Sequence, residues 1–414
     1  MASKSNYDLF KHDGPRVCWL YTTGGKGGHG VKDSDKTSSV NSFGARHIQR
    51  ELAYNYDIVT IDKISNYDFC LVSLTSVVEI ENVLRDIYAY GIDKKGCKIV
   101  LGGMGCLNIW PLHHVADIAV FGRAEGQVNG ILDGERFDNV WRAEDDPMLE
   151  GRYKIRQTQS LLPGESGVGC PKRCSFCQYT HVRRWEKSLT HGYRAGADLI
   201  FEDDWNRLSL GPGRNITAWD GWGEQTRRKV KKGVSDADIV NKLVDLRERG
   251  LAAAANIKIY QIVGYPWDTP ESVQREMTAA AELLRRADGP GTRILIMFAV
   301  TPFSPEPITP LEHHNVDFVN WRDVINDWQS PTGRQRQVYD GESIEAFVLP
   351  QINGPHTLQR RIALNRCHYG NADIVRRFVC ESKGAIANFY DDLDCHPQGQ
   401  PTYLDRDITG EGGA

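Results

Sequence analysis

Short apolar runs alternate with amphipathic stretches of helical period along most of the chain, and this alternation limits the possible folds more than any other feature. In the first third, five apolar runs predict strands at residues 17–21, 58–61, 69–74, 99–101 and 118–121. Helical patterns lie between them at 45–54 and 77–90. Such an order favours an open, mostly parallel α/β sheet, which binds ligands at the carboxyl ends of its strands.

A second α/β segment follows a polar stretch at 133–155 that we interpret as a linker. Strands are predicted at 199–201, 216–218, 257–263 and 294–300. Ser235 is a suitable N-cap for a helix over 236–249, and Thr269-Pro270-Glu271 is a typical helix start. We therefore expect a Rossmann-like, flavodoxin-like domain at 14–150, a second α/β domain at 155–350, and an α-rich extension with a frayed tail at 351–414.

The charge balance and hydropathy exclude several classes of protein. Lys and Arg number 50 against 54 Asp and Glu, a net charge of -4, which argues against a globally basic protein. No run approaches the roughly 18 apolar residues that a membrane span needs. The first residues lack the apolar segment of a signal peptide, so a cytoplasmic, reducing location is expected.

Three of the ten cysteines, Cys170, Cys174 and Cys177, lie together at CxxxCxxC spacing. Three thiolates on one loop can hold three corners of a cubane iron–sulfur cluster and leave one iron open to an outside ligand. The alternative is a structural zinc site with a fourth ligand such as His181. The other cysteines are scattered, and Cys367, Cys380 and Cys395 have no compact ligand spacing. We interpret these last three as structural or free thiols, with a second cluster as the alternative.

The cysteine segment, with Phe176 directly before its last cysteine, resembles the signature of the radical S-adenosylmethionine (SAM) superfamily. The resemblance implies a [4Fe-4S] cluster whose open iron binds the amino and carboxylate groups of SAM. It also implies reductive cleavage of SAM to a 5′-deoxyadenosyl radical that abstracts a hydrogen atom. A partial (β/α)6 barrel of the TIM type is the fold implied for this domain, with a reductase such as flavodoxin or ferredoxin as electron donor.

Four further segments resemble SAM-contacting regions of that superfamily, at 200–204, 216–224 with 231–233, 258–269 and 301–310. The turn reads Trp267-Asp268-Thr269 where the superfamily has Gly-Glu-Thr. Asp203 and Asp204 have helix capping as an alternative role, and Gly264 and Pro266 have turn formation. The SAM-binding residues implied by the resemblance are Phe176, Glu202, Asp203, Asp204, Asp220, Glu224, Gly264 and Pro266.

The first domain resembles the cobalamin-binding domain that precedes the core in a large branch of the superfamily. The resemblance is carried by glycine-rich turns after the fourth and fifth predicted strands. Glycine at a strand end lets a bulky cofactor approach the backbone. Some members keep this fold without the cofactor, so bound cobalamin stays open. The residues implied for cobalamin are Gly102, Gly103, Gly122, Glu125 and Gly126.

Basic residues gather around the cysteine segment and in a second run that we expect to form a loop. With aromatic neighbours such as Trp185 and Trp219, they predict a positive rim suited to an anionic substrate. The alternative is a solvated charged face. The predicted rim residues are Arg183, Arg184, Lys187, Arg227, Arg228, Lys231 and Lys232.

The sequence as a whole predicts a radical SAM enzyme that modifies an unactivated carbon by radical rearrangement or methyl transfer, on a nucleobase in DNA or RNA. One alternative is a cobalamin-dependent methyltransferase acting on a peptide or small metabolite. Another is a degenerate fold used as a non-catalytic interaction module. The intact cysteine motif argues against the last, because a degenerate member should lose its ligands first.

Overall fold

The structure is a computed structural model that describes residues 12–23, 40, 42–157, 165–170, 172–183, 186–187, 193–194, 215–249, 255–351, 354–395 and 403–404. The chain divides into two compact units. The first comprises Met1–Gln159 and Arg360–Ala414, and the second comprises Ser160–Gln359. Each unit is described by itself below.

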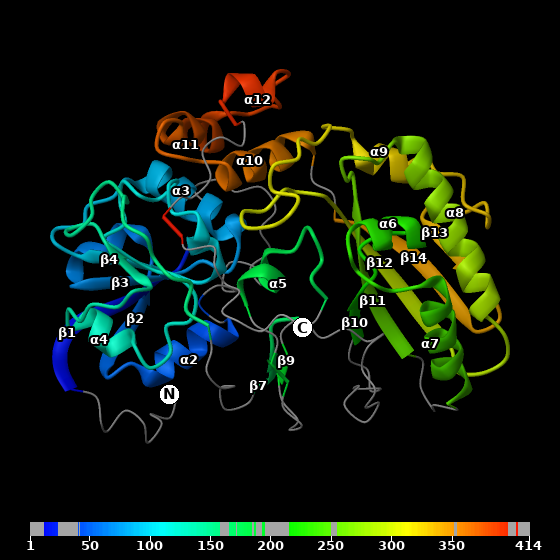
Figure 1. Ribbon diagram of the computed structural model, residues 1–414, viewed down its shortest axis with the longest axis horizontal. Helices are drawn as coiled ribbons and strands as arrows, with labels where there is room; N and C mark the ends of the chain where they lie inside the picture. Colours follow the sequence, from blue (N-terminus) through cyan, green and yellow to red (C-terminus); the bar gives the residue numbers. More distant parts are fainter. Residues whose placement is uncertain are drawn as a thin grey trace. The chain divides into compact units, whose positions relative to one another are not determined.

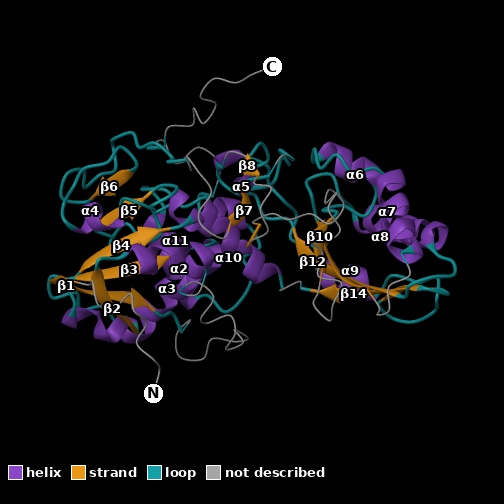
Figure 2. Ribbon diagram, turned by 90° about the horizontal axis from the view of Figure 1, so that it is seen from below, coloured by secondary structure: helices purple, strands orange, loops and turns teal. Residues whose placement is uncertain are grey.

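The first unit contains a six-stranded sheet in the order β2-β1-β3-β4-β5-β6, whose strands lie side by side in Figure 2. Strands β1 to β5 are parallel, and β6 is antiparallel to β5. The order 2-1-3-4-5 is that of flavodoxin-like folds, as predicted. The strands are β1 (His12–Leu20), β2 (Tyr54–Val59), β3 (Phe69–Ser73), β4 (Lys98–Gly102), β5 (Ile118–Val120) and β6 (Val140–Arg142).

The central strands of this sheet are apolar without alternation because both of their faces are buried. In β3, for example, Cys70, Leu71 and Val72 are all buried. Helix α3 begins with a capping box formed by Ser76 and Glu79, which explains why its start was predictable. The other helical elements are α2 (Phe43–Glu51), η2 (Ile61–Asn66), α3 (Val77–Tyr90), η3 (Met104–Leu107) and α4 (Val128–Leu132).

The polar stretch at 133–155 is not a linker, and that expectation was wrong. It contains β6, which pairs with β5 and completes the sheet. Trp141 is fully buried, and the guanidinium of Arg142 donates to the carbonyls of Ile131 and Glu135. Three residues that include a buried arginine give no recognisable apolar run, so the strand was missed.

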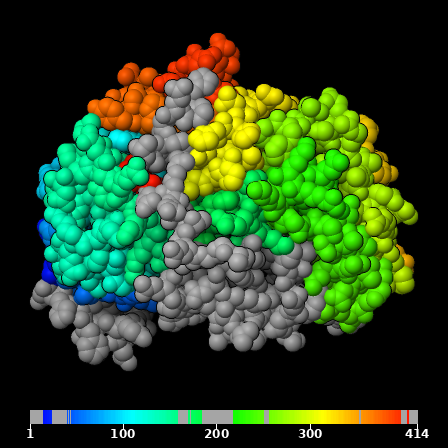
Figure 3. Space-filling model, in the orientation of Figure 1, coloured from blue at the N-terminus to red at the C-terminus, as the bar shows by residue number. Residues whose placement is uncertain are grey.

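The C-terminal segment is α-rich, as predicted, and from Arg360 on it belongs to the first unit. Its helices are α10 (Pro355–Asn365), α11 (Ala372–Glu381) and α12 (Phe389–Asp392), coloured orange to red in Figure 3. The amide of Asn108 donates to the carbonyls of Leu364, Asn365 and Cys367, which ties the end of α10 to the first unit. Cys367, Cys380 and Cys395 are free thiols, and burial raises the pKa of each.

The second unit contains a five-stranded sheet in the order β10-β11-β12-β14-β13, in which only β13 runs antiparallel to its neighbour. A separate three-stranded sheet has the order β8-β7-β9. The predicted strand at 199–201 lies outside the described residues, so closure into a partial barrel stays a prediction. The strands are β7 (Glu165–Val168), β8 (Glu186–Lys187), β9 (Tyr193–Arg194), β10 (Asn215–Ala218), β11 (Ala255–Val263), β12 (Ile294–Pro302), β13 (Gln337–Asp340) and β14 (Ile344–Pro350).

Two long helices cover one face of this sheet, as Figures 1 and 2 both show. Every second residue of β11 is fully buried, and Ile257 and Ile259 pack in one cluster with Leu243 of α7 and Leu284 of α8. Capping boxes at Ser235 and Thr269 start α7 and α8 where the sequence predicted. The helices of this unit are α5 (Gln178–Val182), α6 (Glu224–Lys229), α7 (Asp236–Glu248), α8 (Pro270–Ala287) and α9 (Trp321–Asn326).

In the described part of the chain, none of the helices has both the length and the apolar character needed to cross a membrane.

Candidate functional site

The cysteine loop lies at the carboxyl edge of the second unit's sheet. Strands β10, β11 and β12 are parallel, so the segments that follow Ala218, Val263 and Pro302 meet at one edge. Ser175 donates its amide to the carbonyl of Val230 (2.9 Å) and accepts at its own carbonyl from Leu311 (3.1 Å). The amide of Gln178 donates to Glu306 (3.0 Å). Backbone bonds therefore fix the loop to the segments that follow β10 and β12.

The three motif cysteines differ in burial. Cys174 is buried, whereas Cys170 and Cys177 are half-buried. Helix α5 starts directly after Cys177, and His181 on this helix donates from Nε2 to the carbonyl of Cys174 at 2.9 Å. Burial raises the pKa of the Cys174 thiol to about 12 and that of Cys177 to about 11. Thiols of this kind are unreactive unless a metal replaces the proton.

No group of three or more His, Cys, Asp or Glu side chains within the described ranges is placed to hold a single metal ion. A cubane cluster does not require such convergence, because each of its cysteine ligands binds a different iron atom. A mononuclear zinc site does require it. Three thiolates on one loop are a donor set that fits a cluster with one open iron.

A buried tyrosine that the sequence reasoning did not single out lies between the cysteine loop and the strand ends. Tyr265 follows β11, is 2% exposed, and packs against Phe176 of the cysteine loop with ring centroids 5.9 Å apart. Its hydroxyl donates to the backbone carbonyl of Asp220, at 2.9 Å. Burial raises the pKa of Tyr265 well above its usual value, so the phenol stays a hydrogen-bond donor. Tyr265 thus links the segments after β10 and β11 to the cysteines.

The turn after β11 is shaped by Gly264 and Asp268. Gly264 has a φ of 81°, and a Cβ there would overlap the indole nitrogen of Trp321. The carboxylate of Asp268 accepts from the amides of Gly264 (2.9 Å) and Tyr265 (3.0 Å), and burial raises its pKa to about 6. Pro266 is exposed at the tip of the turn. The fold itself therefore requires a glycine at position 264, whether or not SAM contacts it.

Lys232 was predicted on the exposed rim, and the structure contradicts this. Its side chain is only 8% exposed, and its ammonium pairs with the carboxylate of Asp220 at 2.8 Å. The turn before it places Lys231 at a φ of 58°, which brings position 232 inward. Asp220, predicted to contact SAM, also has a φ of 58° and is 10% exposed. These two residues form a buried ion pair at the carboxyl edge of the sheet.

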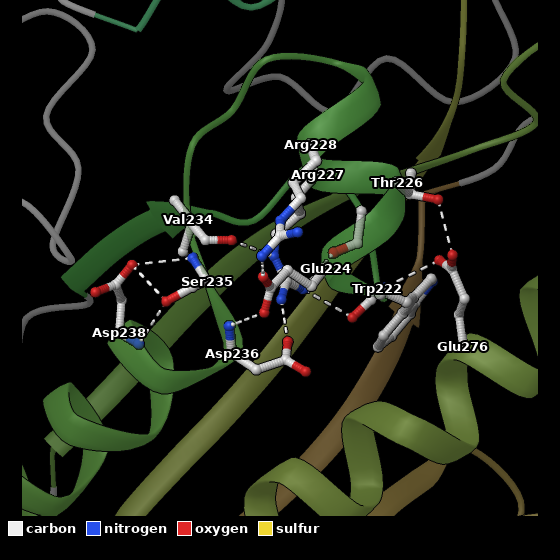
Figure 4. A network of polar contacts seen from close by, with 12 residues as sticks. Trp222, Glu224, Thr226, Arg227, Arg228, Val234, Ser235, Asp236, Asp238 and Glu276 are labelled. Carbon is white, nitrogen blue, oxygen red and sulfur yellow. Dashed lines mark hydrogen bonds and ion pairs between the residues drawn. The ribbon is translucent and has the colours of Figure 1, made fainter.

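Arg227 is also buried rather than on the rim. Figure 4 shows its polar contacts. We expected a loop here, but residues Glu224–Lys229 form α6, which turns position 227 inward. The guanidinium donates to the carbonyls of Val234, Gly221 and Trp222 and pairs with Asp236. Arg227 therefore holds the segment between β10 and α7 together and is not available to a substrate.

The other two predicted rim residues of this run, Arg228 and Lys231, are exposed, but Arg228 is already in an ion pair. Arg228 is exposed and pairs with Glu224. The other oxygen of Glu224 accepts from the amide of Asp236 (2.8 Å), so a SAM contact by Glu224 would compete with both bonds. Lys231 is exposed. The second half of the predicted rim is thus reduced to two exposed cations.

The remaining predicted residues near the cysteines are only partly described. Arg183 lies over the ring of Tyr179, 5.5 Å from its centroid. Lys187 belongs to the short strand β8. Arg184, Glu202, Asp203 and Asp204 lie outside the described residues, so their SAM or substrate roles stay predictions.

Three buried polar atoms around the cysteine loop have no hydrogen-bond partner within the described part of the chain. They are the hydroxyls of Ser175 and Ser304 and the indole nitrogen of Trp267. Ser175 adjoins Cys174, while Trp267 and Ser304 follow β11 and β12. Since buried donors almost always find a partner, these three are suited to a bound polar ligand at the same edge.

In the first unit, two predicted cobalamin-binding glycines are required by the protein itself. A Cβ at Gly103 would overlap the carbonyl of Leu74, and one at Gly122 would overlap the backbone of Arg156. The close approach that we assigned to a cofactor is therefore made by the chain at these two positions. Gly102 and Gly126 have open space where a Cβ would project. Glu125 pairs with Arg123 at 3.1 Å.

No known family model matches this chain. It is similar to an uncharacterized protein of Methanocaldococcus jannaschii, with 22% identity over an alignment of 346 residues. The match covers 66% of this chain and 75% of the relative. Among solved structures it is similar to TsrM, a radical S-adenosylmethionine methyltransferase from Kitasatospora setae with cobalamin and a [4Fe-4S] cluster bound. That similarity has a TM-score of 0.42 and 12% identity, over 72% of this chain and 77% of TsrM.

The chain is also similar to OxsB, a cobalamin-dependent S-adenosylmethionine radical enzyme. The TM-score is 0.30 and the identity 10%, over 95% of this chain and 58% of OxsB. At these TM-scores the similarity is distant. The residues of the site have to be identified from the geometry of this chain.

Proposed function

We propose that this protein is a radical SAM enzyme whose [4Fe-4S] cluster is held by Cys170, Cys174 and Cys177. One observation carries the proposal: a CxxxCxxC loop is bound by its backbone to the carboxyl edge of a parallel α/β sheet. Active sites of such sheets and barrels lie at that edge. The motif supplies only three thiolates, and a three-thiolate cluster keeps one iron for an outside ligand.

The residues around the loop fit the cluster and SAM together. When bound, the cluster supplies one electron that cleaves SAM to methionine and a 5′-deoxyadenosyl radical, which takes a hydrogen atom from the substrate. The rings of Tyr265 and Phe176 pack together beside the cysteines and make this side of the site apolar. The buried donors on Ser175, Trp267 and Ser304 supply hydrogen bonds for polar groups of SAM.

The SAM pocket is proposed between the cysteine loop and the ends of β10 and β11. Phe176, Asp220, Gly264 and Pro266 all belong to these segments, and the Tyr265–Asp220 hydrogen bond joins them. The contribution of Glu202, Asp203 and Asp204 remains as the sequence predicted it. Glu224 is the weakest member of the predicted set, because both of its carboxylate oxygens already accept hydrogen bonds.

For the reaction that follows hydrogen abstraction, we propose methyl transfer if the first unit binds cobalamin and radical rearrangement if it does not. The flavodoxin-like strand order of the first unit supports a ligand at the carboxyl ends of its strands. Gly102 ends β4, and no other atom lies within 4 Å of where a Cβ would project there, so this strand end is open to a ligand. A one-electron donor of the flavodoxin or ferredoxin class is the proposed partner.

A nucleic-acid substrate has lost part of its support. Two of the seven predicted rim residues, Arg227 and Lys232, are buried in ion pairs, and Arg228 is paired with Glu224. Fewer rim cations than predicted are therefore free to contact the phosphates of a polynucleotide, and such contacts supply most of its binding affinity. A peptide or a small metabolite fits the described residues equally well, so the substrate class is left to experiment.

The direct test is anaerobic reconstitution with iron and sulfide, followed by dithionite, SAM and mass spectrometry for 5′-deoxyadenosine. The wild-type protein should form 5′-deoxyadenosine, and Cys174→Ala should form none. Cys106→Ala is the matched control, because Cys106 is an equally buried cysteine outside the motif. Cleavage of SAM by Cys174→Ala at the wild-type rate would refute the proposed function.

A further inference from the structure

The turn that carries Lys232 is joined to the cysteine loop at two points. The amide of Ser175 donates to the carbonyl of Val230 at 2.9 Å. The ammonium of Lys172 donates to the carbonyl of Gly233 at 3.3 Å. Lys232 lies between these two contact points in the chain. The contacts therefore hold the Lys232 backbone against the segment that contains Cys174.

The Lys232–Asp220 pair is fixed from both sides by backbone bonds. The amide of Lys232 donates to the carbonyl of Arg227 at 2.8 Å. The amide of Asp220 donates to Tyr260 at 3.3 Å, and the carbonyl of Asp220 accepts from the hydroxyl of Tyr265 at 2.9 Å. With both side chains about nine-tenths buried, the pair is an oriented dipole with little freedom to rotate.

Both residues of this pair are tied by contacts to the segment that contains Cys174. The bonds from Ser175 and Lys172 hold the turn of Lys232 against this segment. On the other side, Tyr265 donates to the carbonyl of Asp220 and packs its ring against Phe176 of the same segment. Charges in a buried site are poorly screened, so a unit charge here has a large effect. Each charge of the pair therefore acts with its own sign on a cluster held by this segment.

We propose that the Lys232–Asp220 pair sets the reduction potential of the cluster bound at Cys174, with Lys232 raising it and Asp220 lowering it. This inference rests on the proposed function. Reduction adds one electron to the cluster, and the ammonium stabilises the added negative charge while the carboxylate destabilises it. In this role Lys232 and Asp220 act on the cluster through their charges. Their role explains why the chain keeps a buried ion pair at a place where apolar residues would fold as well.

The test is a redox titration of the reconstituted protein with dithionite and mediators, followed by the EPR signal of the reduced cluster. Lys232→Met removes the positive charge and should make the potential more negative. Asp220→Asn removes the negative charge and should make it more positive. Each change should alter the one-electron equilibrium constant at least about tenfold, which corresponds to about 59 mV. The double variant should return toward the wild-type value.

The opposite signs separate an electrostatic role from a disturbed fold, because structural damage would shift both variants the same way or lose iron. Asp220→Asn also keeps the backbone, since Asn tolerates a positive φ. If Lys232→Met fails to hold a cluster, the potential of Asp220→Asn alone tests whether the ion pair sets the reduction potential. Lys231→Met is the matched control: it changes an exposed lysine of the same turn and should leave the potential unchanged.

Two failures are distinguishable in this experiment. A wild-type protein that takes up no iron and sulfide would refute the proposed function and leave no cluster to titrate. A wild-type cluster whose potential is the same in Lys232→Met and Asp220→Asn, or shifts in the same direction in both, would overturn the inference about the ion pair alone.

Discussion

The ammonium of Lys232 lies 2.8 Å from the carboxylate of Asp220, and both side chains are buried at the carboxyl edge of the second unit's sheet. The charges of these two residues therefore neutralise each other within the protein. Around this pair, the described residues include the packed rings of Phe176 and Tyr265 and three buried donors without a partner, and two cations of the following segment are exposed. Such a surface suits a polar ligand of modest charge.

Arg227 should be a major determinant of stability in the second unit. Arg227→Met leaves three buried carbonyls without a donor and removes the partner of Asp236. We expect a loss of about 3 kcal/mol in the free energy of unfolding, measured by urea denaturation followed by tryptophan fluorescence. Arg228→Met is the matched control on the same helix, and its urea midpoint should equal that of the wild type. Equal midpoints for both variants would contradict the network in Figure 4.

Substitution of Gly264 and of Gly333 by Ala separates the cost of a steric clash from the cost of a positive φ. Both have positive φ, 81° and 68°, but only Gly264 has a side chain, that of Trp321, where a Cβ would project. Gly333→Ala should cost about 1 kcal/mol from its conformation alone. Gly264→Ala should cost about 1–3 kcal/mol more, because Trp321 must move. Unfolding free energies that are equal in the two variants would show that the packing of Trp321 against the turn is wrong.

Asp288 should make the free energy of unfolding of the second unit depend on pH. Burial raises its pKa, but hydrogen bonds from the amides of Ser343, Glu342 and Ile344 outweigh this and lower the pKa to about 2. An unfolded Asp titrates near pH 3.9, so this stabilisation is complete above about pH 4 and is lost as the pH falls toward 2.

The matching measurement uses Asp288→Asn in urea at pH 7 and at several values below pH 4. The variant should be less stable than the wild type by about 1–2 kcal/mol at pH 7, after allowance for solvent screening of a partly exposed carboxylate. The difference should shrink as the pH falls. Asp340→Asn, on strand β13, is the matched control for removing a carboxylate from this part of the unit. A difference that stays constant down to pH 2 would contradict the assignment.

Cobalamin uptake should depend on Gly102 if the first unit binds that cofactor. Gly102→Leu places a side chain in open space at the end of β4, so the fold should tolerate it while the cofactor is excluded. Gly384→Leu, also into open space in this unit, is the control. The absorbance of cobalamin retained after gel filtration is the readout. Gly103→Leu is unsuitable, because it collides with Leu74 whether or not a cofactor binds. Equal retention by Gly102→Leu and wild type would place cobalamin elsewhere or exclude it.

Local signals account for what the sequence predicted well. Ser76 with Glu79, Ser235 with Asp238, and Thr269 before Pro270 each satisfy the first amides of a helix, and all three helices start there. The apolar runs of β11 and β12 were found because they are strongly buried: buried and partly buried residues alternate along all of β11 and along the first half of β12. The cysteine loop was predicted from its spacing and from Phe176. The structure places it at the carboxyl edge of the sheet, and its role as cluster ligand stays a prediction.

Tertiary contacts account for what the sequence did not predict. Arg227 and Lys232 read as exposed basic residues, yet one turns inward on a short helix and the other is drawn in by the φ of Lys231. Tyr265 carried no signal because its partners, Phe176 and Asp220, are distant in sequence. Gly103 and Gly122 were correctly seen as places of close approach, but the approaching group is the backbone of this chain.

The most direct test of the central claim is the metal and sulfide content of protein reconstituted without oxygen. The account predicts about four irons with matching acid-labile sulfide per chain in the wild type and in Cys106→Ala, and loss of both in Cys170→Ala, Cys174→Ala and Cys177→Ala. One zinc per chain without sulfide, lost in His181→Ala as well as in the three cysteine variants, would contradict it.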